Sequence, residues 1–169
     1  EIVKDVMDYS AAICDTDGNM IAQAKTVALH LGAVPEAMDV VLDQYGPGLV
    51  PGDAVILNDP YQGGMHLPDI FMFMPIFDAD ENLQGFSVVI CHHTDVGGRV
   101  PGSNASDSTE IFQEGLRIPA LKLFEAGEPN ETLFKLIEIN VRLPDRVVGD
   151  LKAQFAACRT GARELGKIF

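Results

Sequence analysis

A segment of twelve residues, from Asn58 to Asp69, concentrates side chains that could bind a metal ion. It contains Asp59, His66 and Asp69, together with two prolines and two adjacent glycines. Carboxylate and imidazole groups are ligands that Zn²⁺ and Mn²⁺ take in mixed sites. Prolines and paired glycines favour an irregular backbone, so we expect a loop here. A long turn without a metal is the alternative for any one of these residues.

A second polar segment follows a short apolar stretch further along the chain. Residues 88–90 are Val-Val-Ile, which predicts a buried strand, and they lead through Cys91 into His92, His93 and Asp95. Three of the four histidines of the chain lie in these two polar segments. Neighbouring residues of a strand point to opposite faces, so we do not expect both His92 and His93 to be metal ligands.

Together the two segments could form one divalent metal site. We expect four side chains to converge on a single Zn²⁺ or Mn²⁺ ion: Asp59, His66, Asp69 and His93. His92 is the substitute for His93 as the fourth ligand. Two carboxylates against one dication leave such a site near neutral, which suits burial. The histidine that is not a ligand would orient a ligand or act on a substrate as acid or base, and His92 and Asp95 are our catalytic candidates.

A β-hairpin between the two segments would bring them together. Residues 70–77 and 83–91 are apolar runs separated by the charged turn 78–82, which predicts two antiparallel strands. The first strand would begin beside His66 and Asp69, and the second would end at His92 and His93. Residues 53–57 predict a further short buried strand that leads into the first segment.

The rest of the chain predicts an α+β fold, a mostly antiparallel sheet with flanking helices. Residues 9–24 have the pattern of a β-hairpin with Asp-Gly in its turn, whereas a calcium loop would need a longer pattern that is absent here. Helices are predicted at 35–45 and 145–169, and Asn130 begins another. His30 precedes the first helix, where it could line a pocket or cap the helix.

Composition argues against several classes of function. The chain has 169 residues and a net charge of −13, which disfavours binding to a nucleic-acid backbone or an anionic membrane surface. No apolar run approaches the roughly 18 residues of a membrane span. Three cysteines without a CxxC pair suit reduced thiols in the cytoplasm. The chain starts at Glu1 and its last helix has no cap, so we expect residues 1–169 to be a single domain or a fragment of a larger subunit.

Six motifs in this chain resemble, in the same order, those of the hydantoinase B family. They are DYSA at 8–11, HLG at 30–32, NDPYQGGMHLPD at 58–69, HHTDVGG at 92–98, TEIFQEGLR at 109–117 and GDLKAQ at 149–154. The family includes the B subunits of N-methylhydantoinase-type amidohydrolases, the matching half of 5-oxoprolinase and the alpha subunits of acetone-type carboxylases. The resemblance covers almost the whole chain, but only the N-terminal third or so of a family subunit.

The resemblance implies a metal-dependent part of an ATP-dependent hydrolase of cyclic amides, such as hydantoins or 5-oxoproline. In the family a hydantoinase A-type partner uses ATP to phosphorylate a carbonyl oxygen of the substrate, and the B subunit completes hydrolysis beside a divalent metal. The metal positions of the family match Asp59, His66, Asp69 and one of His92 and His93. The chain has no GxxxxGK sequence followed by Ser or Thr, so the partner would handle ATP in a cytoplasmic hetero-oligomer.

Other functions stay open at the level of sequence. The alpha subunit of an ATP-dependent ketone carboxylase would carry the same motifs and act on a ketone with bicarbonate. A non-catalytic, metal-stabilised assembly domain would use the same loops only to hold subunits together. A metal-free interaction protein would bind no ion at all.

Overall fold

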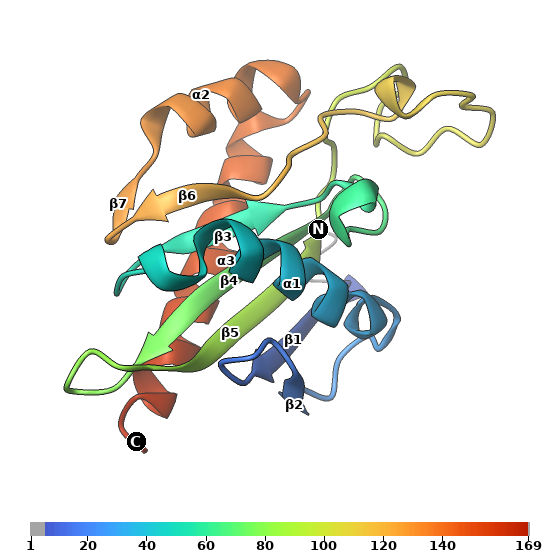
Figure 1. The fold of residues 1–169 in the computed structure, drawn as a ribbon. Helices are drawn as coiled ribbons and strands as arrows, with labels where there is room; N and C mark the ends of the chain where they lie inside the picture. The colour runs from blue at the N-terminus through green and yellow to red at the C-terminus, as the bar shows by residue number, and fades with distance from the viewer. Residues whose placement is uncertain (1–5, 169) are drawn as a thin grey trace.

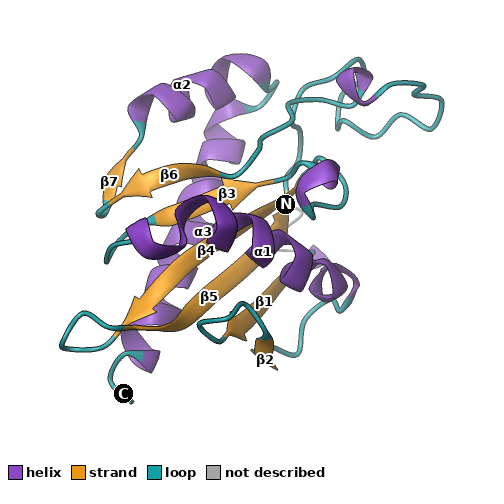
Figure 2. Ribbon diagram, viewed as in Figure 1, coloured by secondary structure: helices purple, strands orange, loops and turns teal. Residues whose placement is uncertain are grey.

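The computed structural model describes residues 6–168, which form one antiparallel sheet with helices on both faces (Figure 1, Figure 2). The seven strands lie in the order β2-β1-β5-β4-β3-β6-β7, and each neighbouring pair is antiparallel. Their bounds are Tyr9–Cys14 for β1, Met20–Gln23 for β2, Ala54–Leu57 for β3, Asp69–Phe77 for β4, Leu83–His92 for β5, Leu121–Glu125 for β6 and Glu128–Pro129 for β7. The expected α+β fold is therefore confirmed.

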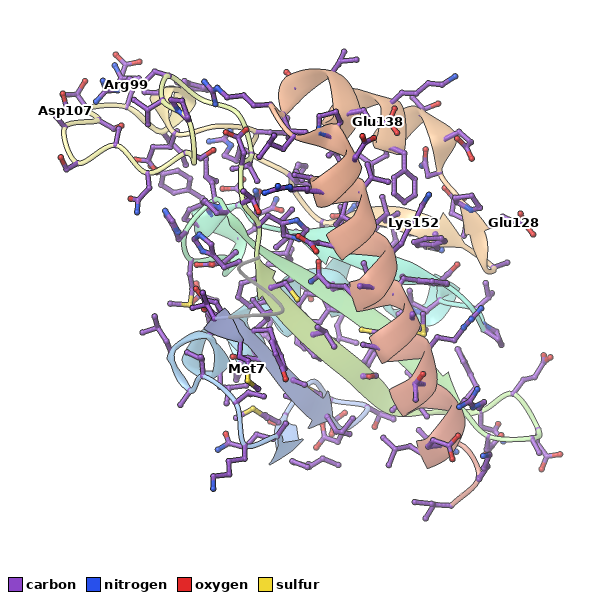
Figure 3. All side chains as sticks on the ribbon, turned by 180° about the vertical axis from the view of Figure 1, so that it is seen from behind. Met7, Arg99, Asp107, Glu128, Glu138 and Lys152 are labelled. Carbon is purple, nitrogen blue, oxygen red and sulfur yellow. The ribbon has the colours of Figure 1, made fainter. Side chains whose placement is uncertain are left out.

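Helices cover the two faces of the sheet separately. Helix α1, Val34–Tyr45, packs on one face, and α2, Glu131–Asn140, and α3, Pro144–Leu165, pack on the other. Seen from behind, α3 crosses the central strands along most of their length (Figure 3). Short 3-10 helices lie in the connections: η2, Leu29–Ala33; η3, Gly46–Gly48; η4, Pro60–Gln62; and η5, Ile111–Gln113. None of the helices within residues 6–168 is both long and apolar enough to cross a membrane.

The expected central hairpin is present as β4 and β5. Both strands are buried on both faces, because α1 lies over one face and α3 over the other. Alternate residues of β5 divide between the two cores: Phe86, Val88 and Ile90 face α1, whereas Val89 and Cys91 face α3. The register pairs Asp69 at the start of β4 with His92 at the end of β5. The hairpin therefore joins the two polar segments at one edge of the molecule, as the sequence predicts.

Several element boundaries differ from the sequence-based expectation. Helix α1 begins one residue earlier than predicted, at Val34, and α3 begins at Pro144 and ends at Leu165. The predicted end of that last helix, Phe169, lies outside the described residues. Asn130 does begin α2, since its side chain accepts a hydrogen bond from the backbone N–H of Leu133 at 3.1 Å. Strands β6 and β7 are additions that the sequence analysis did not predict.

The three cysteines are free and buried, and this leads to a simple chemical prediction. Burial raises the pKa of Cys14, Cys91 and Cys158 to about 12, and only the thiolate is reactive. We expect a thiol reagent such as DTNB to leave all three unmodified in the native protein and to titrate all three in guanidinium chloride. Stoichiometric labelling of any of them under native conditions would contradict this burial.

Candidate metal site

Three side chains of the two polar segments come together where β4 begins and β5 ends. His66, Asp69 and His92 each offer one ligand atom, and these atoms lie within 4.8 Å of one another. Nδ1 of His92 lies 2.7 Å from Oδ1 of Asp69, and Nδ1 of His66 lies 3.6 Å from Oδ2 of the same carboxylate. The His66 and His92 rings stack with their centroids 5.4 Å apart. Asp69 is therefore held between two imidazoles.

The electrostatics of this group centre on the Asp69 carboxylate, which is only 5% exposed. Burial alone would raise the pKa of Asp69, but His66 and His92 outweigh burial and hold the pKa far below its usual range. In turn, the hydrogen bond with Asp69 raises the pKa of His92 against the opposing effect of burial. His66 is the more open member, with 36% of its side chain exposed. The group is thus open to solvent on the His66 side.

The loop that carries His66 is fixed by close packing against α1. Gly63 has a φ of 82°, and a Cβ there would lie 2.4 Å from the backbone nitrogen of Ala37. At Gly64 a Cβ would lie 2.5 Å from the carbonyl oxygen of Asn58. Side chains at these two positions would therefore clash with backbone atoms. The paired glycines let the loop turn back so that His66 reaches Asp69.

His93 does not share this group, which corrects the expectation that it joins His66 and Asp69. Its side chain is fully buried on the α3 face, where Nε2 lies 2.8 Å from Oε1 of Gln154. Burial lowers the pKa of His93 to about 4. The physical reason is strand alternation, which continues through the end of β5 and turns His92 toward the α1 face. The substitute, His92, thus takes the place expected for His93.

Asp59 also lies outside the group, although we expected it to be a ligand. Its Oδ1 accepts a hydrogen bond from the backbone N–H of Tyr61 at 3.0 Å, which caps η4. Its Oδ2 lies 3.5 Å from Nε of Arg117. The guanidinium of Arg117 in turn lies 5.8 Å from the ring centroids of Tyr61 and Phe112. Asp59 therefore caps η4 and pairs with the Arg117 guanidinium.

Asp95, our other catalytic candidate, holds the second loop together. Its carboxylate accepts hydrogen bonds from the backbone N–H groups of Gly97, Gly102 and Arg142, and from the Arg142 guanidinium at 3.0 Å. Burial alone would raise the pKa of Asp95, but these donors lower it. These hydrogen bonds give Asp95 a structural role in the loop. The catalytic role expected for Asp95 stays a prediction.

Two residues that were not among the predicted ligands, His30 and Asp8, lie near this group. Nε2 of His30 is 3.7 Å from Oδ1 of Asp69 and 3.9 Å from Oδ1 of Asp8. His30 comes from η2 and is 2% exposed, and Asp8 directly precedes β1. The pairing of β1 with β5 brings Asp8 to His92, whose backbone N–H donates to the Asp8 carbonyl oxygen at 3.0 Å. Sequence patterns indicate this placement of Asp8 and His30 only weakly, because it depends on the order of the strands in the sheet.

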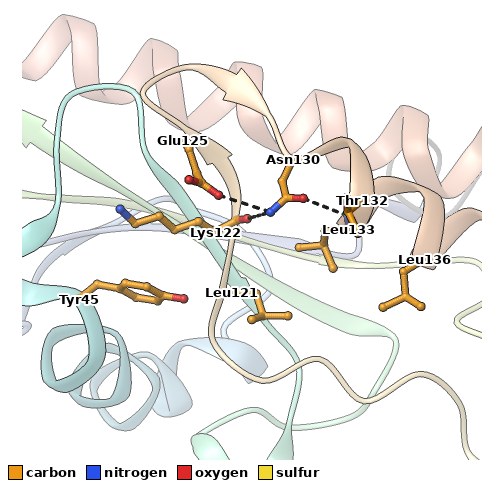
Figure 4. A pocket seen from close by; sticks show the side chains of 8 residues that line it. All are labelled: Tyr45, Leu121, Lys122, Glu125, Asn130, Thr132, Leu133 and Leu136. Atoms are coloured by element: carbon orange, nitrogen blue, oxygen red, sulfur yellow. Dashed lines mark hydrogen bonds between the residues drawn. The ribbon is translucent and has the colours of Figure 1, made fainter.

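A pocket of about 680 Å³ elsewhere in the fold does not share these residues. It lies between the end of α1, β6 and α2, and it is lined in part by Tyr45, Lys122 and Asn130 (Figure 4). Nζ of Lys122 is 2.7 Å from the buried carboxylate of Asp53, and Asn130 caps α2. Lys122 and Asn130 are thus engaged in structural contacts. The chemistry of the described residues therefore points to the His66, Asp69 and His92 group.

Comparison with known proteins identifies the family of this chain. The family model described as Hydantoinase B/oxoprolinase matches residues 1–169. The chain belongs to this family. The caprolactamase subunit beta of Pseudomonas jessenii, a curated relative, is 39% identical over 158 residues, which cover 94% of this chain and 27% of that protein. This hydantoinase B/oxoprolinase chain therefore spans less than a third of the length of that relative.

Two solved structures have the same fold as this hydantoinase B/oxoprolinase chain. The crystal structure of the ATP-dependent caprolactamase from Pseudomonas jessenii superposes with a TM-score of 0.89 at 38% identity, covering 95% of this chain and 28% of that one. A nucleotide-free structure of acetone carboxylase superposes with a TM-score of 0.91 at 21% identity, covering 99% of this chain and 22% of that one. The second likeness concerns the fold alone.

The chemistry of the donor set fits a divalent metal ion. Two imidazoles and a carboxylate are suitable ligands for Zn²⁺ or Mn²⁺. Within residues 6–168, the ion pairs of the buried Asp69 carboxylate are with histidines and not with lysine or arginine. A divalent cation would therefore take the place of the protons that these histidines hold beside Asp69. His66, Asp69 and His92 are the residues that would hold it.

Proposed function

We propose that this chain is the metal-binding part of a subunit that hydrolyses cyclic amides with the help of ATP. The observation that carries the proposal is the His66, Asp69 and His92 group in a member of the hydantoinase B/oxoprolinase family. The family description and the caprolactamase relative share one substrate class, since hydantoin, 5-oxoproline and caprolactam all contain a ring amide. We therefore propose a ring amide as the substrate.

The three residues of the group would each contribute a defined part of this chemistry. A bound Zn²⁺ or Mn²⁺ ion would supply a Lewis acid and favour the ionisation of water. Asp69 would fix both histidines, since it contacts His66 and His92 through its two different oxygens. The exposed side of His66 would admit the amide carbonyl. The stack of the two rings would keep the imidazoles from turning away.

The proposal also includes a partner. The caprolactamase relative is named a beta subunit, and the solved caprolactamase is described as ATP-dependent. We propose that a hydantoinase A-type subunit binds and uses ATP, and that the two subunits form a hetero-oligomer. The free, buried cysteines are consistent with a cytoplasmic location, which we include in the proposal.

The test is an assay of the full-length subunit mixed with its A-type partner. Ring opening and ATP consumption would be measured with hydantoin, 5-oxoproline and caprolactam, and with acetone plus bicarbonate for the carboxylase alternative. We expect ATP-dependent ring opening of at least one amide, and elemental analysis should find a divalent metal in the complex. Carboxylation of the ketone without amide hydrolysis would overturn the proposed reaction. A complex that binds metal and assembles, but turns over no substrate, would favour a structural assembly domain.

A further inference from the structure

The two edges of the sheet differ in how well they are protected against pairing with a further strand. At one edge, β7 consists only of Glu128 and Pro129. A charge and a proline on an edge strand both hinder the addition of another strand. At the other edge, residues 20–24 read Met-Ile-Ala-Gln-Ala, without a charge or a proline, and Ile21 is 63% exposed. The β2 edge is therefore open to a further strand.

The backbone of β2 presents hydrogen-bonding groups at this open edge. Among the described residues, β2 pairs with β1 alone, and the irregular register of this pair is confined to the step from Ile13 to Cys14. The N–H of Ala24 donates to the carbonyl oxygen of Ala11 at 2.9 Å. Because successive residues of a strand direct their N–H and C=O groups to opposite sides, those of Gln23 point away from β1. A neighbouring strand could therefore form hydrogen bonds with Gln23.

An apolar groove of about 340 Å³ lies beside the same edge, on the face of the sheet that carries α3. It is lined by residues of β1, β2 and β5 and by Ala157 and Gly161 of α3. None of the described residues that line it is ionisable. Helix α3 packs mainly on β4 and β5, and the view from behind shows β1 and β2 beside the helix instead of beneath it (Figure 3). The layer of helices on this face thus ends before the sheet does.

We propose that an extended segment from the remainder of the same subunit pairs with β2 and places apolar side chains in this groove. The relatives have the length for such a segment, because this chain covers only 27% of the caprolactamase subunit beta and 28% of the solved caprolactamase chain. Strand addition at an open edge takes its affinity from backbone hydrogen bonds and its specificity from side-chain pockets. The backbone of Gln23 and the groove provide one of each. The inference does not depend on the proposed function.

Two other occupants fit these observations less well, a second copy of this chain and the A-type partner. Each copy of the chain has a net charge of −13, so two copies repel each other. A groove without ionisable side chains offers a separate subunit no charged group to recognise. A segment of the same polypeptide needs no such group, because the covalent link keeps it at a high local concentration.

The first test is hydrogen exchange on the full-length subunit without its partner, resolved to single amides by electron-transfer fragmentation. The Ala24 amide, which is bonded inside the sheet, is the internal reference. We expect the Gln23 amide to exchange roughly 100-fold or more slowly than in an unstructured peptide, because it is bonded to the added strand. Exchange of Gln23 at the unstructured rate would overturn the inference. Protection that appears only with the A-type subunit, or only at high protein concentration, would overturn it as well, because the strand would then come from the partner or from a second copy.

The second test places a charge in the groove. Ala157→Glu is compared with Ala156→Glu, because both alanines are exposed on α3 but only Ala157 lines the groove. A buried carboxylate without a partner is costly, so we expect Ala157→Glu to speed exchange of the Gln23 amide roughly tenfold or more and Ala156→Glu to leave it unchanged. The Ala24 amide should stay protected in both variants, which shows that β1 and β2 remain paired. Unchanged exchange of Gln23 in Ala157→Glu would show that no segment fills the groove and would overturn the inference.

Discussion

Replacing Asp69 by Asn is expected to abolish metal binding and, with it, ring opening by the assembled enzyme. Asp69 is buried and contacts His66, His92 and His30 through its two oxygens. An amide keeps the shape of the carboxylate but loses its charge and one acceptor. Loss of an outer hydrogen-bond partner typically costs 10–100-fold in metal affinity, and we expect the loss of this ligand to cost roughly 100-fold or more. Chelator competition and the rate of ring opening measure the two effects.

Asp59→Asn is the matched control for this substitution. It makes the same chemical change in the same loop, but Asp59 contacts Tyr61 and Arg117 and not the histidines. We expect Asp59→Asn to leave the metal affinity unchanged. The hydrogen bond from the Tyr61 backbone N–H that caps η4 should become weaker, because the acceptor loses its charge. Wild-type metal affinity in Asp69→Asn would rule out the proposed ligand group. Equal losses in the two variants would restore Asp59 as a ligand.

The hairpin that builds the site was predictable because its signals are local. Two long apolar runs joined by a short charged turn favour a hairpin, because strands that follow each other in sequence commonly pair. Pairing of β4 with β5 then places Asp69 opposite His92. The glycine pair at 63–64 also marked the turn that returns His66 to this edge. Local patterns thus bring His66, Asp69 and His92 into one candidate group.

The choice between His92 and His93 could not be made from sequence. Alternation along β5 predicts that the two point to opposite faces, but it does not say which face carries the site. That depends on α1 and η2 covering one face and α3 the other. Gln154, which holds His93, is 61 residues further along the chain. Likewise, the placement of His30 and Asp8 needed the strand order, which apolar patterns do not contain.

A buried amide in the site loop gives the second large prediction. Asn58 is 0% exposed, and its side chain makes three hydrogen bonds to backbone groups. Its Nδ2 donates to the carbonyl oxygens of Leu67 at 2.6 Å and Leu116 at 2.9 Å, and its Oδ1 accepts from the N–H of Ile118 at 2.6 Å. Asn58 therefore ties the segment between His66 and Asp69 to the connecting segment at Leu116 and Ile118, almost 50 residues further along the chain.

Asn58→Ala should destabilise the fold and loosen the metal site together. Each buried backbone group left without a partner costs about 1–3 kcal/mol, so we expect a total loss of about 3–5 kcal/mol. The midpoint of thermal unfolding of the full-length subunit should fall by several degrees. Metal affinity should fall as well, because Leu67 lies between two of the ligands. Asn130→Ala is the control, since it removes the cap of α2 at a cost of about 1 kcal/mol and should leave metal affinity intact. If Asn58→Ala lowers the midpoint no more than Asn130→Ala does, the three hydrogen bonds do not stabilise the loop as inferred.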